Sequence, residues 1–172
     1  MSETGSVALH QYLTFTLGSE LFALDIGWVK EILDDKNITK IPRTPDFVRG
    51  VINVRGRAIP VVDLRLKFGM PATELATNTC VIIAEVEMQG EKVVMGALAD
   101  AVQEVLELRP DDIEPAPRLG SAIDVEFIQA IGKHNSKFII ILDINKVFSP
   151  DELADVNEVG GGQQRDQLQA AA

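Results

Sequence analysis

The sequence of 172 residues has few of the side chains that build catalytic and metal sites. It contains one cysteine, Cys80, and two histidines, His10 and His134, which lie far apart in the chain. A single cysteine excludes an internal disulfide and a four-cysteine zinc site, and it is typical of a reducing compartment. No phosphate-binding loop ending in Gly-Lys-Ser or Gly-Lys-Thr occurs, and each histidine is best explained as a solvated side chain. We therefore expect a protein that is not an enzyme and that holds no metal and no cofactor.

Positive charge is scarce as well, because 16 Lys and Arg stand against 26 Asp and Glu, which gives a net charge of -10. This charge repels nucleic acid, and one Trp and one Tyr offer few surfaces on which bases could stack. The longest strongly apolar run, residues 138–142, is far shorter than the roughly 20 residues of a membrane-spanning helix. Residues 1–6 include an acid and no apolar stretch, unlike a secretory signal. We expect a cytoplasmic protein that binds no nucleic acid and meets a membrane only through a partner.

Short runs of β-branched and aromatic residues, separated by Gly, Asn and charged pairs, are frequent and predict a mainly β fold. The 46% hydrophobic content is enough for a sizeable core. The expected strands cover residues 12–17, 20–25, 50–54, 58–63, 79–86, 92–98, 126–132 and 137–142. Short helices are expected at residues 27–33, at residues 64–68, and from residue 149 or 151 to about 156.

The second half of the chain repeats the first. Residues 26–33 resemble residues 99–106, position 38 matches position 113, and residues 57–64 resemble residues 137–144. The offsets grow along the chain from 73 (26 to 99) through 75 (38 to 113) to 80 (57 to 137), as insertions in the turns of a duplicated unit would produce. Units of about 70 residues are too small for a wide sandwich, and strand edges must be paired or covered. We expect two small β-barrels that bury a third apolar patch between them.

Charge is distributed unevenly along the chain. Residues 43–67 carry six Lys and Arg against two Asp, a balance of +4, so the remainder of the chain sums to -14. These cations either decorate exposed strand faces or form an interface, for which the planar guanidinium of arginine is well suited. The acidic pairs at 34–35 and 111–112 are typical of turns and helix starts rather than of acid-base catalysis. Asp63 and Asp143 are expected to cap the short helical segments that follow them.

One string in this basic segment is specific to a known family. Residues 50–56 read Gly-Val-Ile-Asn-Val-Arg-Gly, and Pro-Val-Val-Asp-Leu follows at 60–64. With the flanking segments, this pattern resembles the CheW family of bacterial chemotaxis coupling proteins over about residues 9–156. The departures are Val54 in place of the usual Leu and Ala99 in place of a Val. Residues 1–8 are expected to form a flexible N-terminus, and the Gly-, Gln- and Ala-rich residues 157–172 a flexible tail outside the family core.

The resemblance implies a pseudo-repeated, mainly β domain of two small SH3-like five-stranded β-barrel subdomains with short helices. It also implies an adaptor that joins the cytoplasmic hairpin tip of methyl-accepting chemotaxis receptors to the regulatory domain of the histidine kinase CheA. Such an adaptor would lie at the inner face of the membrane, within receptor arrays, and would let receptors control the kinase. A docking module of a paralogous, non-flagellar signalling pathway is the alternative.

The resemblance assigns the functional positions of the family to individual residues of this sequence. The receptor-binding positions implied by the resemblance are Val29, Glu31, Gly50, Arg55, Thr79, Cys80 and Val81. The implied kinase or ring contacts are Glu20, Arg49 and Leu119. A receptor hairpin presents an amphipathic helical pair, so its apolar stripe would lie in a groove between the two barrels, with Glu31 and Arg55 at the rim.

Overall fold

The computed structural model describes residues 10–88, 90–115 and 127–147 as two β-sheets with a few short helical turns. Sheet A comprises β1 (His10–Leu17), β2 (Glu20–Asp25), β8 (Ala101–Leu108), β9 (Ile113–Pro115), β10 (Ile128–His134) and β11 (Lys137–Leu142). Sheet B comprises β3 (Val29–Leu33), β4 (Val48–Val54), β5 (Arg57–Asp63), β6 (Cys80–Met88) and β7 (Glu91–Ala99). The helical turns are η1 (Ile26–Trp28), α2 (Leu64–Lys67), η2 (Pro110–Asp112) and α3 (Ile144–Val147).

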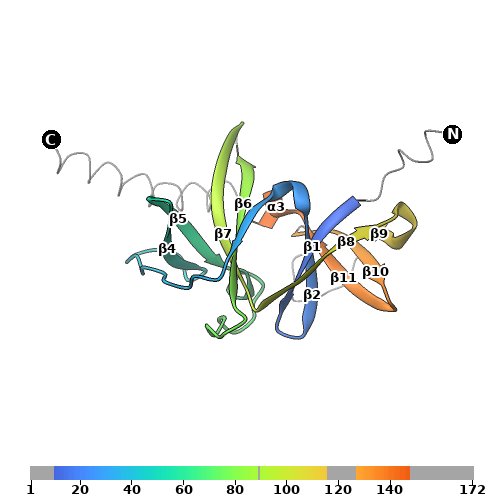
Figure 1. Cartoon of the computed structure of the whole chain (residues 1–172), viewed down its shortest axis with the longest axis horizontal. Coiled ribbons are helices and arrows are strands. Elements are labelled where there is room, and N and C mark those ends of the chain that lie inside the picture. The colour runs from blue at the N-terminus through green and yellow to red at the C-terminus, as the bar shows by residue number, and fades with distance from the viewer. Residues whose placement is uncertain (1–9, 89, 116–126, 148–172) are drawn as a thin grey trace.

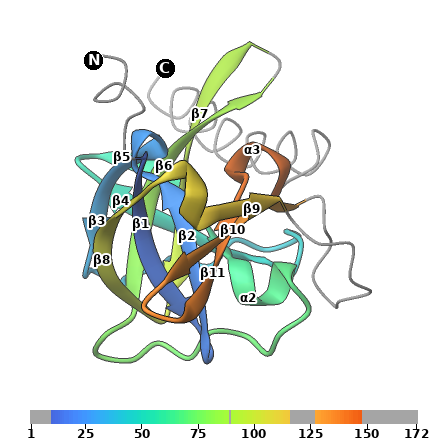
Figure 2. The ribbon, with the colours of Figure 1, turned by 90° about the vertical axis from the view of Figure 1, so that its right-hand side faces the viewer.

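The two sheets lie side by side along the long axis of the molecule (Figure 1) and overlap in the view along that axis (Figure 2). The strand order is β8-β1-β2-β11-β10-β9 in sheet A and β3-β6-β7-β5-β4 in sheet B. The first repeat therefore places β1 and β2 in sheet A but β3, β4 and β5 in sheet B, and the second repeat places β6 and β7 in sheet B. Each lobe is thus built from both halves of the chain, and the repeat does not coincide with a lobe.

The predicted repeat is confirmed by matching irregularities in the strand pairing. The β4–β5 register shifts between Val48 and Gly50, and the β10–β11 register shifts 80 residues later, between Ile128 and Ala130. Each sheet also contains one parallel pair, β5 with β7 and β11 with β2. A bulge bends a strand at a defined position, so bulges at equivalent positions show that the two units have the same local geometry.

Both sheets curl so that their outer strands approach each other. In sheet B, the chain leaves β3 and forms a bridge from Thr39 to Val51 of β4, although β3 and β4 are the two edges. In sheet A, β8 and β9 are the two edges, yet only residues 109–112 separate them in the chain. A short link between opposite edges requires a curled sheet, in agreement with the small SH3-like units predicted from the sequence.

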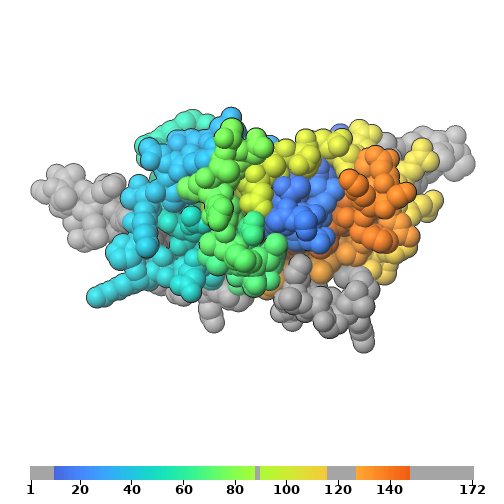
Figure 3. Space-filling view, turned by 90° about the horizontal axis from the view of Figure 1, so that it is seen from below, coloured from blue at the N-terminus to red at the C-terminus, as the bar shows by residue number. Residues whose placement is uncertain are grey.

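The core has three parts, as the sequence predicted. One cluster belongs to sheet A around Ile139 and Ile141, and a second belongs to sheet B around Ile52 and Leu98. The third and largest draws side chains from both sheets, including the stacked rings of the phenylalanines at 15, 22 and 68. The N-terminal hairpin, blue in Figure 3, lies in the middle of the molecule between green and orange segments. The two lobes therefore share a packed core at their junction.

Two sequence predictions of local structure differ from the structure. The helix expected at 27–33 is wrong, because η1 ends at Trp28 and Val29–Leu33 is a strand whose residues alternate in exposure. Its β-branched Val29 and Ile32 fit a pleated edge strand better than a helix. Strands β8 and β9 were not expected, since the polar residues interspersed along β8 mask its period. The helix expected at 149–156 and both flexible ends lie outside the described residues.

Candidate functional site

Glu31 and Arg55 meet on the surface of sheet B as an ion pair. Arg55 Nη1 donates to Glu31 Oε1 at 3.3 Å, and Arg55 Nη2 donates to Glu31 Oε2. Arg55 has a φ of 52° and lies in the tight turn that joins β4 to β5, a conformation that matches the twist of a hairpin. The hydrogen bonds and charge of Arg55 lower the pKa of Glu31 below its ordinary value. Arg55 remains 75% exposed, so its guanidinium is available to a partner.

A second charge pair lies beside the first. Lys30 Nζ on β3 and Glu85 Oε1 on β6 are 3.6 Å apart. The sequence analysis missed Glu85, because only the cross-strand register places it opposite β3. Together the two pairs make this surface of sheet B charged but electrically balanced.

The other expected receptor-binding positions on β3, on β6 and directly before β6 divide into exposed and buried members. Val29 is half-buried and packs against the shared core. Thr79 and Val81 are buried, and the Thr79 hydroxyl accepts a hydrogen bond of 2.8 Å from the Ala76 backbone N–H. Cys80, between them, is partly exposed. The surface available along the β3–β6 edge therefore comes from Val29, Glu31 and Cys80, with Thr79 and Val81 as support beneath it.

Gly50 acts through its backbone. It lies at the β4 bulge with a φ of 142°, and an added Cβ would lie 2.0 Å from the carbonyl oxygen of Thr39. Thr39 and Val51 exchange two backbone hydrogen bonds of 2.8 Å across this contact. Gly50 therefore allows the segment that leaves β3 to reach β4, which brings Glu31 toward the β4–β5 turn.

The expected kinase or ring contacts are not brought together. Glu20 is exposed at the start of β2 in sheet A, whereas Arg49 lies on β4 in sheet B, and Leu119 lies outside the described residues. Arg49 Nη1 donates to the buried Asp63 at 2.8 Å and to the Thr73 carbonyl at 3.0 Å. Part of the Arg49 guanidinium is thus engaged inside the protein.

The acidic residues have the structural roles predicted from the sequence. Asp63 accepts from the Arg65 backbone N–H at 3.1 Å and caps α2, and Asp143 accepts from the Asn145 backbone N–H at 3.2 Å. Asp35 and Asp112 accept backbone N–H groups in their own turns. Within the described ranges, no three His, Cys, Asp or Glu side chains are grouped so as to hold a metal ion. None of the helices described there is long and apolar enough to cross a membrane.

The side chains at the junction of the two lobes are packed in the shared core, and the surface groove that the sequence analysis expected along this junction stays a prediction. The apolar side chains at the junction are buried in the shared core. Two ion pairs connect side chains at the surface of the β3–β6 edge and of the β4–β5 turn. This arrangement provides charged side chains beside half-buried apolar ones, which is suited to binding another protein.

Comparison with known proteins agrees with this architecture. A family model described as a CheW-like domain matches residues 11–152. The chain is 37% identical over 155 residues to the chemotaxis protein CheW of Klebsiella aerogenes, covering 90% of this chain and 91% of that one. It is 31% identical over 143 residues to the chemotaxis protein CheW of Treponema pallidum, covering 83% and 84%.

A solved structure has the same fold. The crystal structure of the scaffolding protein TtCheW from Thermoanaerobacter tengcongensis matches with a TM-score of 0.75 and 38% sequence identity, covering 84% of this chain and 96% of that one. The family-model match extends over strands of both sheets and over the Gly-Val-Ile-Asn-Val-Arg-Gly string. The chain belongs to the CheW family of chemotaxis adaptors.

Proposed function

We propose that this chain couples chemotaxis receptors to the histidine kinase CheA, acting by binding alone. The single observation that best supports the receptor surface is the Glu31–Arg55 ion pair, which joins the opposite edges of sheet B. It places two of the expected receptor-binding residues in contact and next to Val29 on the same strand. The proposed location is the inner face of the membrane, reached through the receptors.

The proposed physical basis of receptor binding is that an amphipathic receptor helix lies along the edge strand β3. Ile32 follows Glu31 on β3 and is an exposed apolar side chain, and the two side chains point to opposite faces of the strand. Because β3 is an edge strand of sheet B, a helix laid along this edge can contact both side chains. An amphipathic receptor helix can cover the apolar part while its own charged residues contact Arg55 and set its register. Each contact is weak, but many adaptors held in one array bind at a high effective concentration, which increases the overall affinity.

The kinase is proposed to bind elsewhere on the molecule, at positions that include Glu20, Arg49 and Leu119. Glu20 and Arg49 lie on different sheets, which supports two separate contacts rather than one patch. An adaptor needs both kinds of surface to be accessible at the same time. The regulatory domain of CheA is the proposed kinase partner.

Reversal of the Arg55 charge tests the receptor surface. Arg55→Glu places two carboxylates together at Glu31, and we expect receptor-fragment binding to fall by roughly tenfold or more. The fold should remain, because Arg55 is exposed. Arg57→Glu, an exposed cation next to the same turn that makes no ion pair in the described structure, is the matched control.

Reconstitution measures the coupling itself. Receptor fragments and CheA are mixed with or without this protein, and CheA phosphorylation is followed. We expect strong added phosphorylation only with the wild-type chain and the Arg57→Glu control. No enhancement at saturating protein would refute coupling, and wild-type binding by Arg55→Glu would refute the receptor surface.

A further inference from the structure

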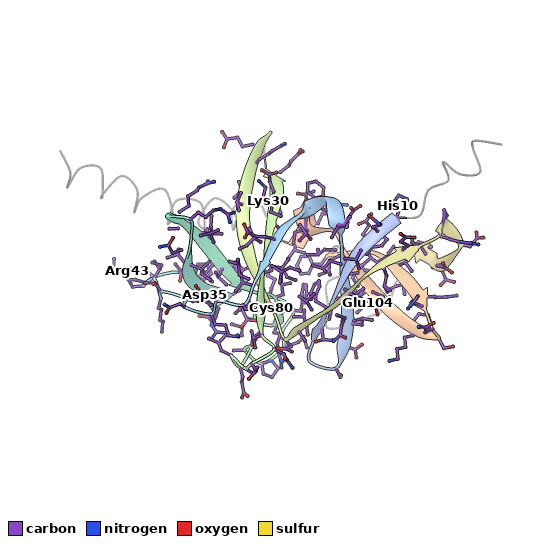
Figure 4. The ribbon with its side chains drawn as sticks, in the orientation of Figure 1. His10, Lys30, Asp35, Arg43, Cys80 and Glu104 are labelled. Carbon is purple, nitrogen blue, oxygen red and sulfur yellow. The ribbon has the colours of Figure 1, made fainter. Side chains whose placement is uncertain are left out.

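Sheet A carries a groove of about 590 Å³ that the proposed receptor surface does not include. Its walls come from β1, β2, β8 and the β10–β11 turn. The lining residues used below are Leu21, Glu104, Leu106, Asn135, Lys137 and Phe138. Glu104, labelled in Figure 4, lies on β8 in the lobe opposite to the one that carries Lys30.

This groove is the counterpart, in the repeat, of the Glu31–Arg55 surface. Glu104 follows Glu31 by 73 residues, and the strand pairing is irregular at both positions. Asn135 follows Arg55 by 80 residues, and the two have φ angles of 51° and 52° in equivalent tight turns. The two surfaces therefore carry their side chains at equivalent backbone positions, with similar bulges and turns.

The two surfaces differ in their charges. Sheet B supplies its own cation, Arg55, to Glu31, whereas sheet A has Asn135 at the equivalent position. Lys30 of sheet B is likewise replaced by Gln103. In the described parts of the chain, no ion pair or hydrogen bond engages the Glu104 carboxylate, and the ammonium of Lys137, which also lines the groove, is unpaired there too. Sheet A thus has no arginine at the position equivalent to Arg55, and its Lys137 does not pair with Glu104.

The backbone that carries Glu104 is held in place. The buried Thr14 hydroxyl donates to the Glu104 carbonyl at 2.7 Å and accepts from the Glu104 N–H at 3.1 Å. These two bonds satisfy the backbone groups of the bulged strand. The exposed carboxylate is therefore attached to an ordered backbone, which reduces the entropy that a partner must lose on binding.

An exposed aromatic ring adds apolar area at the same groove. Phe138 is 66% exposed, the highest value among the large apolar side chains of the described residues. Its counterpart in the first repeat, 80 residues earlier, is the small Ala58. An aromatic side chain next to an unpaired charge is the composition of a binding hot spot, in which an apolar contact shields a charged hydrogen bond from water.

We propose that this groove is a second docking surface, for a protein segment that presents an arginine between apolar side chains. The guanidinium of the partner would form an ion pair with Glu104, as Arg55 does with Glu31. The apolar neighbours of that arginine would cover Phe138 and Leu21. The net charge of -10 attracts such a basic segment over long range. Glu20, one of the proposed kinase contacts, also lines this groove, so the inference rests in part on the proposed kinase contact. The peptide titration below needs neither receptor nor CheA, so its failure is distinguishable from a failure of the proposed coupling.

The test is an NMR titration of the full chain with a capped leucine-arginine-leucine peptide. We expect saturable amide shifts at Glu104, Asn135 and Phe138, and binding weaker by roughly tenfold when citrulline replaces arginine. Glu104→Gln should weaken binding by a similar factor. Glu107→Gln, on the same strand but outside the groove lining, should bind like the wild type.

A variant that introduces a cation within the chain tests the proposal independently of the peptide substitutions. Asn135→Arg should place an arginine on Glu104 within the chain, since Arg55 adopts the same φ, and should block the peptide. The proposal is overturned if the groove shows no saturable shifts, or if citrulline and Glu104→Gln leave binding unchanged. Sedimentation showing self-association that is lost in Glu104→Gln would identify a second copy as the occupant and would overturn the assignment to a partner.

Discussion

Cys80 is a partly buried thiol whose reactivity depends on its neighbours. Burial, followed by the charge of Asp34, raises the pKa of Cys80 above its ordinary value of about 9. The Sγ atom lies 3.8 Å from Asp34 Oδ1 and 3.3 Å from the Asn78 carbonyl oxygen. The thiolate is the reactive form, so a raised pKa keeps this cysteine protonated at neutral pH. Its place in the expected receptor surface is therefore one of packing rather than of covalent chemistry.

Alkylation by iodoacetamide across a pH series measures this effect. We expect the midpoint of the rate profile above pH 9 in the wild type, and a lower midpoint in Asp34→Asn, which removes the second cause of the shift. Asp35→Asn removes the neighbouring charge that does not contribute and should leave the midpoint in place. A wild-type midpoint below 9 would contradict the assignment.

The β4 strand depends on a glycine at its bulge. Gly50 combines a φ of 142° with the close approach of the Thr39 carbonyl, so a side chain there meets both backbone strain and a steric clash. Gly56 in the next turn has a φ of 83°, but an added Cβ there would meet nothing within 4 Å. A comparison of substitutions at the two glycines therefore distinguishes the effect of backbone strain from the effect of the steric clash with Thr39.

Gly50→Ala is therefore expected to be much more destabilising than Gly56→Ala. We expect the free energy of unfolding to fall by about 2–3 kcal/mol in Gly50→Ala and by about 1 kcal/mol in Gly56→Ala. Urea unfolding followed by circular dichroism gives both values. Equal losses would show that the approach of Thr39 to β4 adds nothing to the stability of this strand.

The two sheets are joined by a polar link in addition to the shared core. Asp100, between β7 and β8, accepts from the Gly18 N–H of the β1–β2 turn at 2.6 Å and from Arg65 Nη1 at 2.8 Å. Gly18 belongs to sheet A, while Arg65 lies on α2 directly after sheet B. One carboxylate therefore connects both lobes at the point where the chain crosses between them.

Loss of this link should destabilise both lobes together. Asp100→Ala removes two charge-assisted hydrogen bonds at a partly exposed site, and we expect the free energy of unfolding to fall by about 1–2 kcal/mol in one cooperative transition. Glu114→Ala, which removes the exposed ion pair with Lys133, should change it by less than about 0.5 kcal/mol. Two separate unfolding transitions in Asp100→Ala would contradict cooperative coupling through the shared core.

Local patterns predicted most of the strands and the repeat, but not the partners of individual residues. The alternation in residues 12–17 and the apolar run at 137–142 are local signals, and both segments are strands in the structure. The edge strand β3 was mistaken for a helix because five residues are too few to distinguish the two periods. The positions of Thr79 and Val81 beneath Cys80 could not be predicted either, since burial depends on what covers a strand.

The order of residues in the chain was sufficient to establish the mainly β class, the duplicated unit, the third apolar patch and the family. The β class and the apolar patch follow from composition and short-range periodicity, the duplicated unit follows from the similarity of distant segments, and the family follows from the resemblance of the string at residues 50–64. Which strands share a sheet, and which residues meet, was decided by folding in three dimensions. Glu31 and Arg55 are 24 residues apart and become neighbours only because sheet B curls. The place of Glu104 in the groove beside Asn135 likewise follows from the curl of sheet A, because long-range packing and register have no local signature.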